Sequence, residues 1–175
     1  MYNRITSDIL DQFKQVISEI RLIYAVEDLD IYAHDETEDL RFYPEVVALP
    51  ETPEEIAALI KICNTHQIPV TPRGAGTGLS GGSLAINGGL MIAMQRMNKI
   101  IEIDERNLQA TVEPGVITET FINAVAEKGL LYPVDPASKG SCFIGGNISH
   151  GSGGPRVVKY GTIREYVLNL QVVLP

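Results

Sequence analysis

The sequence has 175 residues, of which 45% are hydrophobic, with a mean hydropathy of +0.06 and a formal net charge of −8. This length suits one ordinary domain or two small lobes and is too short for a large two-domain enzyme, while the hydropathy is typical of soluble globular proteins. The acidic balance argues against nucleic acid as a partner, and no apolar run approaches the ~18 residues of a membrane span.

The N-terminal part of the chain is expected to hold a helix followed by a surface loop. Ser7 can cap a helix whose apolar residues recur at helical spacing and form one buried stripe, made of Ile9, Leu10, Phe13, Val16, Ile17 and Ile20. The acidic stretch from Glu27 to Asp39 has no periodicity. We therefore expect it to cross the surface as a solvated loop.

A strand–helix–strand pattern begins after Tyr43. Residues 46–49 form a short apolar run that predicts a buried strand. Thr52 and Pro53 mark a helix start, and Glu55 can close a capping box. Cys63 falls on the apolar face of this helix and is expected to be a core residue. A second strand, at residues 67–72, then leads into Arg73.

Arg73 is followed by a glycine-rich run that ends at Gly82. Such a run can turn its backbone N–H groups around a phosphate, which makes it a candidate anion site. The run is not a P-loop, because no lysine follows its last glycine. It also differs from a dinucleotide-binding turn, because its glycines continue too far for a helix to start directly after the turn. Loop amides would hold the phosphates. The alternative is a flexible loop with no ligand.

The remaining elements alternate between strands and helices. We expect a strand at 90–94, a hairpin of 99–104 with 109–113, a helix at 118–128 ended by Gly129, and a proline-punctuated loop at 132–138. A second glycine cluster follows at 145–154, and a last strand is expected at 166–174.

The cysteines and histidines predict neither a disulfide nor a metal site. Cys63 and Cys142 lie far apart without ligand-like spacing, and the beginning of the chain lacks the pattern of a signal peptide. We therefore expect a cytoplasmic protein. His34, His66 and His150 show no metal-ligand spacing.

The two glycine clusters, separated by Glu113-Pro114-Gly115-Val116 and Asp135-Pro136-Ala137-Ser138, form a specific combination. From about Tyr32 to Pro175 the chain resembles the FAD-binding domain of the vanillyl-alcohol oxidase and p-cresol methylhydroxylase (PCMH) superfamily. Within it, the chain is similar to the D-subunit of glycolate oxidase and the D-lactate and D-2-hydroxyglutarate dehydrogenases. This resemblance implies an α+β fold, a two-lobed PCMH-type domain truncated before its end. It would have a helical segment at 1–31, a first lobe at 32–95 and an incomplete second lobe at 96–175.

The resemblance also assigns FAD-binding residues. The pyrophosphate would be bound by a first group, Pro72, Arg73, Gly74, Ala75, Gly76, Thr77, Gly78, Leu79 and Ser80. The rest of the cofactor would be lined by a second group, Pro136, Ser138, Gly145, Gly146, Asn147, Gly153, Gly154 and Gly161. Some relatives carry a flavin-linked histidine where this chain has Thr77, so we expect noncovalent FAD.

The second cluster departs from the resemblance after Asn147. Relatives in the hydroxyacid branch continue there with a small residue, Glu, Asn and Ala, whereas this chain has Ser149-His150-Gly151-Ser152. His150 would either lie near the isoalloxazine and stabilise negative charge on the reduced ring, or be exposed.

The implied activity is oxidation of a 2-hydroxyacid, in which a hydride passes to the flavin and a base takes the hydroxyl proton. In the family, the base and the substrate-binding arginines lie largely in a C-terminal cap domain, so no catalytic residue is assigned here. Two hypotheses remain open: the FAD-binding portion of a glycolate or D-lactate type dehydrogenase or oxidase, or a truncated noncatalytic flavin-binding module. Self-association or a partner subunit is expected in either case.

Overall fold

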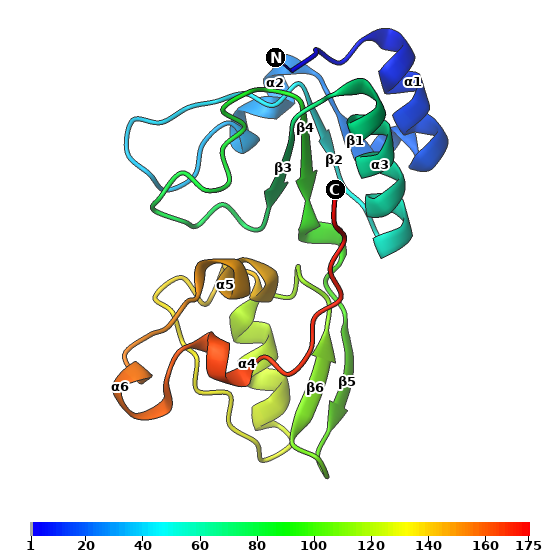
Figure 1. Ribbon diagram of the computed structural model, residues 1–175. Helices are drawn as coiled ribbons and strands as arrows, with labels where there is room; N and C mark the ends of the chain where they lie inside the picture. Colours follow the sequence, from blue (N-terminus) through cyan, green and yellow to red (C-terminus); the bar gives the residue numbers. More distant parts are fainter. Residues whose placement is uncertain (1) are drawn as a thin grey trace. The chain divides into compact units, whose positions relative to one another are not determined.

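The computed structural model describes residues 2–175, which form two units, each with a sheet of its own. Unit 1 comprises Met1–Arg96 and Val172–Pro175, and unit 2 comprises Met97–Gln171. Helices and strands are combined in both units, which confirms the α+β class (Figure 1).

The sheet of unit 1 has the strand order β1-β2-β4-β3. β1 (Leu22–Ile23) pairs antiparallel with β2 (Val46–Ala48), and β4 (Leu90–Ala93) pairs in parallel with both β2 and β3 (Val70–Arg73). All residues of β2 and β4 are buried, as their continuous apolar sequences predict. β3 ends at Arg73, which pairs with Ala93 of β4.

The helices α1 (Ser7–Val16) and α3 (Pro53–His66) pack against each other (Figure 1). Two predictions about α1 are wrong. Its N-cap is Thr6, which makes no side-chain cap bond, and Ser7 is the first helical residue. The helix also stops before Ile20, which lies in the short helix η1 (Glu19–Arg21) and is 82% exposed. The buried stripe therefore ends earlier than the sequence pattern suggests.

The predicted start of α3 at Thr52 and Pro53 is confirmed, but the predicted capping box is not closed. The Oγ1 atom of Thr52 accepts a hydrogen bond from the Glu55 N–H at 3.2 Å, with Pro53 in the first turn. Cys63 is fully buried, and burial raises the pKa of its thiol to about 12. It is a core residue.

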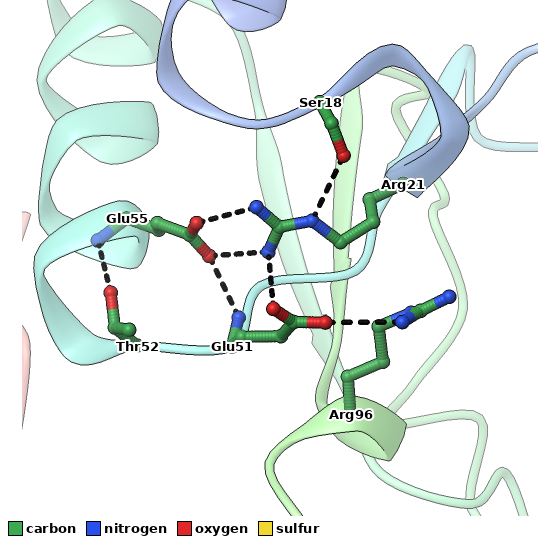
Figure 2. Close-up of polar contacts among 6 residues, drawn as sticks. All are labelled: Ser18, Arg21, Glu51, Thr52, Glu55 and Arg96. Atoms are coloured by element: carbon green, nitrogen blue, oxygen red, sulfur yellow. Dashed lines mark hydrogen bonds and ion pairs between the residues drawn. The ribbon is translucent and has the colours of Figure 1, made fainter.

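An ion-pair network joins this helix start to Arg21 at the end of η1 (Figure 2). The guanidinium of Arg21 binds both carboxylate oxygens of Glu55, at 2.8 and 2.6 Å. Glu55 also accepts the N–H of Glu51 at 2.7 Å, one residue before the N–H that a capping box would use, while Glu51 pairs with Arg96. The hydrogen bonds from Arg21 lower the pKa of the Glu55 carboxyl.

The acidic stretch is not the solvated loop that we expected. It begins as α2 (Val26–Leu29) and continues as η2 (Asp30–Tyr32). Leu29 and Tyr32 are buried in the core of unit 1, in a cluster completed by Val47, Leu49, Ala85, Met91 and Ala93. Burial of Leu29 and Tyr32 anchors the stretch to the core, while the acidic residues Glu27 and Asp28 stay exposed.

Unit 2 is built on the predicted hairpin of β5 (Ile100–Asp104) and β6 (Gln109–Val112). α4 (Thr118–Ala126) and α5 (Ile144–His150) contribute Phe121, Val125 and Ile144 to its core. The ring of Tyr132 packs edge-on against Phe121, with 4.9 Å between ring centroids.

The C-terminal part of the chain contains α6 (Val157–Tyr160) and η4 (Ile163–Tyr166). The predicted strand at 166–174 is wrong: within the described residues this segment has no strand partner, and its alternating apolar residues, such as Leu168 and Val172, are exposed. Each helix of residues 2–175 falls short of the length and hydrophobicity that a bilayer crossing needs.

Candidate functional site

The first glycine run forms the connection between β3 and β4, and it contains no helix. Gly74 directly follows Arg73, the last residue of β3, and the chain then bends and turns until Leu90. Within residues 2–175, the backbone N–H groups of residues 74–80 donate to no acceptor. A row of unpaired amides at the carboxyl end of a parallel strand is suited to binding an anion, as the sequence indicates.

Arg73 does not extend its charge into solvent. Its side chain is 7% exposed, and Nη2 donates to the carbonyl oxygens of His34 at 2.8 Å and Ile31 at 3.2 Å. Nη1 makes longer bonds to Tyr32 O and Ser83 Oγ. Burial lowers the pKa of this guanidinium, and the Asp35 carboxylate opposes that shift. Direct binding of a phosphate by Arg73 stays a prediction, since the observed donors already serve the chain itself.

The glycines of the run differ in why the chain needs them. Gly76 has a φ of +75°, and a β-carbon there would collide with the guanidinium of Arg73. Gly78 has no such φ, and the nearest atom to its β-carbon position is Asp35 Oδ2 at 4.0 Å. Packing within the chain therefore explains Gly76, whereas the open space at Gly78 leaves room for a ligand to approach the backbone.

Asp35 lies buried beside this open position. Its Oδ1 atom accepts the N–H of Thr37 at 2.9 Å, while its Oδ2 atom is buried and has no partner among the described residues. Sequence reasoning missed this residue, because a carboxylate within an acidic stretch is usually solvated. The signal that could have found it is the apolar pair Tyr32-Ala33, which lies two residues before it and is buried.

The remaining members of the first group lie along the same loop, apart from Pro72, which belongs to β3. Gly74, Ala75 and Thr77 are half-buried, whereas Pro72, Leu79 and Ser80 are exposed. All members of this group belong to unit 1, and all members of the second group belong to unit 2.

The second glycine cluster begins inside a helix, which the sequence did not predict. Gly145 lies in α5, and a β-carbon there would come within 2.7 Å of Pro114. Asn147 is 3% exposed and donates from Nδ2 to Thr118 Oγ1 at 2.6 Å. Gly146, between them, has nothing within 4 Å of its β-carbon position. Asn147 thus fastens α5 to α4, and Gly146 leaves an open backbone surface.

The later glycines are held by packing and by backbone geometry. A β-carbon on Gly154 would collide with the carbonyl of Asp135, and one on Gly153 would collide with Val157. Gly161 has a φ of +78° at the end of α6. These positions require glycine for the fold itself.

Pro136 and Ser138 lie in a turn that is closed by their own carbonyl groups. Pro136 O accepts the N–H of Lys139 at 2.9 Å, and Ser138 O accepts the N–H groups of Ser141 and Cys142, both at 2.8 Å. The Ser138 hydroxyl bonds to no other described residue. It is available to a ligand.

The histidines of the described part of the chain do not form a cluster with other candidate metal ligands. No group of three or more His, Cys, Asp or Glu residues there is arranged to hold a metal ion. His150 is exposed in the last turn of α5, and His66 contacts Gln12 at 3.2 Å.

Comparison with known proteins gives a consistent result. The FAD binding domain family matches residues 44–175. The chain is 45% identical over 170 residues to the glycolate oxidase subunit GlcD of Bacillus subtilis, covering 97% of this chain and 36% of that protein. It is 40% identical over 178 residues to the D-lactate dehydrogenase of Anaerostipes hadrus, covering 99% of this chain and 36% of the relative. The chain therefore spans about a third of the length of these relatives.

Solved structures show the same fold. Alkyldihydroxyacetonephosphate synthase superposes with a TM-score of 0.88 at 19% identity, over 98% of this chain and 34% of that protein. p-Cresol methylhydroxylase superposes with a TM-score of 0.63 at 25% identity, over 77% of this chain and 27% of that protein.

Proposed function

The chain belongs to the family of FAD binding domains, and on that premise we propose that it is the FAD-binding portion of a flavin-dependent oxidoreductase acting on 2-hydroxyacids of the glycolate or D-lactate type. The observation that carries the proposal is the row of unpaired amides at residues 74–80 in a chain so similar to a glycolate oxidase subunit. FAD, when bound, supplies the acceptor for the hydride that leaves the substrate carbon.

In this proposal the loop amides of unit 1 bind the pyrophosphate. A diphosphate carries acceptor oxygens only, so it pairs with N–H groups that the fold leaves without acceptors. The open backbone at Gly78 lets the phosphates approach closely. The N–H donors of Arg73 already bind carbonyl groups, so in this proposal Arg73 does not contact the phosphates directly. Its buried positive charge attracts them through the low-dielectric interior beneath the loop.

Unit 2 contributes contacts to the remainder of the cofactor. We assign direct contact to Ser138, whose hydroxyl has no other described partner, and to the backbone at Gly146, where no side chain intervenes. Asn147 acts through α5, because its amide group binds Thr118. Gly153, Gly154 and Gly161 shape the adjoining backbone.

A second candidate function is a flavin-binding module that needs a further domain or a partner chain for turnover. The relatives are about three times as long as this chain, and one of them is named as a subunit, which supports a division of binding and catalysis. In this case the chain binds FAD but does not oxidise 2-hydroxyacids alone.

A titration of FAD into the purified chain tests the cofactor assignment. We expect saturable quenching of flavin fluorescence, and an unchanged signal would overturn the assignment.

Anaerobic addition of glycolate or D-lactate to the complex then separates the two candidates. Bleaching of the flavin absorbance would show turnover by this chain, whereas an unchanged spectrum together with FAD binding would support the binding module.

The compartment is part of the same proposal. Cys63 and Cys142 are both unpaired and buried. Reduced thiols of this kind fit a reducing environment, which supports a cytoplasmic protein.

A further inference from the structure

The segment at residues 31–37 contacts the glycine loop at several separate points. We propose that this segment is a positioning element that holds the loop in its ligand-binding conformation, with Thr37 as the positioning residue at the far end of the loop. The inference rests on the proposed FAD function. It assigns a role to residues that the cofactor assignment leaves unused.

One end of the loop is tied to the segment by Arg73. Nη2 of Arg73 bonds to the carbonyl oxygens of Ile31 and His34, so the strand end and the segment cannot move apart without exposing a buried charge. Gly76 lies directly over the guanidinium, where a side chain would collide with it. The first turn of the loop is therefore shaped around Arg73.

The middle and the far end of the loop are tied by two more hydrogen bonds. The N–H of Glu36 donates to the carbonyl of Gly78 at 3.1 Å. The N–H of Gly81 donates to Oγ1 of Thr37 at 2.8 Å. Between these bonds the loop N–H groups have no acceptors, so the segment fixes the loop without consuming the donors that a phosphate would use.

Thr37 is itself held in place by the buried Asp35. The Thr37 N–H donates to Asp35 Oδ1 at 2.9 Å, which fixes the backbone that carries the hydroxyl. Two successive hydrogen bonds therefore connect Asp35 to Thr37 and Thr37 to Gly81, and we call this connection the relay. The relay matters because a glycine-rich loop loses more conformational entropy than other segments when it is ordered. A loop already fixed by the protein binds its ligand more tightly than one that is ordered only on binding.

Substitution of the Thr37 hydroxyl tests this role. Thr37→Val keeps the shape of the side chain and removes the acceptor, whereas Thr37→Ser keeps the acceptor. We expect Thr37→Val to weaken FAD binding about fivefold, as the loss of one ordinary hydrogen bond does, and Thr37→Ser to restore it to within about twofold of the parent chain. Thr65→Val is the matched control, because the Thr65 hydroxyl bonds within α3 to Lys61 O.

Amide hydrogen exchange of Gly81, followed by NMR without FAD, gives a second readout. We expect faster exchange in Thr37→Val and parent-like exchange in Thr37→Ser and Thr65→Val. Equal FAD affinity in Thr37→Val and the parent chain, unchanged Gly81 exchange in Thr37→Val, or a loss in Thr37→Ser equal to that in Thr37→Val would each overturn the positioning role. Failure of the parent chain to bind FAD would instead overturn the proposed function, and the exchange data would still decide whether Thr37 anchors the loop.

Discussion

The guanidinium of Arg73 fills the space that a side chain on Gly76 would need, and Gly76 adopts a φ of +75° above it. Gly76→Ala should therefore destabilise the chain by about 2–4 kcal/mol, because alanine pays for the left-handed backbone and also displaces a buried arginine. Urea unfolding at neutral pH measures the change. Gly82→Ala is the control, since nothing lies within 4 Å of that β-carbon position. A loss of stability in Gly82→Ala equal to that in Gly76→Ala would contradict the explanation.

Gly78→Ala should leave the stability of the chain nearly unchanged and weaken FAD binding. We expect a change in the free energy of unfolding within about 0.5 kcal/mol, because Gly78 has an ordinary φ and open space around it. FAD binding should weaken about tenfold, since a methyl group would stand where the phosphates approach the backbone. Thermal unfolding and FAD titration of the same preparation measure both effects. Parent-like affinity would mean that no ligand approaches at Gly78.

The ion pair of Arg21 and Glu55 predicts a pH dependence of stability. Pairing lowers the pKa of Glu55 in the folded chain, so its stabilisation is fully present above the unfolded pKa of about 4.3 and is lost as the pH falls through the folded value. Glu55→Gln should cost about 1–3 kcal/mol at pH 7 and progressively less at acidic pH. Urea unfolding between pH 7 and pH 3 measures this. The exposed neighbour Glu54, as Glu54→Gln, should show little change at either pH.

FAD bound by this chain should be released when the protein is denatured by acid. By the resemblance described for the sequence, Thr77 would stand where some relatives carry a flavin-linked histidine, and a threonine hydroxyl forms no such bond. The absorbance of the supernatant and of the washed pellet after acid precipitation measures the release. Colour that stays with the precipitated protein would show a covalent link.

Cys63 should resist alkylation in the folded chain. Burial raises the pKa of its thiol to about 12, so almost no thiolate forms at pH 8, and the side chain is inaccessible to the reagent. Mass spectrometry of the Cys63 peptide after iodoacetamide treatment, with and without guanidinium, measures the difference. Rapid labelling under native conditions would contradict its placement in the core.

Local patterns in the sequence predicted the elements that depend on neighbouring residues. The Thr52-Pro53 pair defines the start of α3, and the long glycine run correctly excludes a helix after β3. These features depend on backbone propensity and on contacts within one turn, which the sequence displays directly.

Features that depend on distant contacts could not be predicted in this way. The acidic stretch packs against unit 1 because Leu29 and Tyr32 are buried in its core and because Arg73, far along the chain, binds its carbonyl groups. Likewise, α5 forms through a glycine cluster because Ile144 is buried and Asn147 reaches Thr118. The segment at 166–174 alternates like a strand but has no partner in the described chain, and alternation alone does not supply one.

The unpaired amides at residues 74–80 leave the fold without FAD short of hydrogen-bond acceptors in one small region. The chain should reach its full thermodynamic stability only when FAD is bound, since a ligand that binds the native form alone raises stability by mass action. Its resistance to added protease should therefore rise with the concentration of FAD.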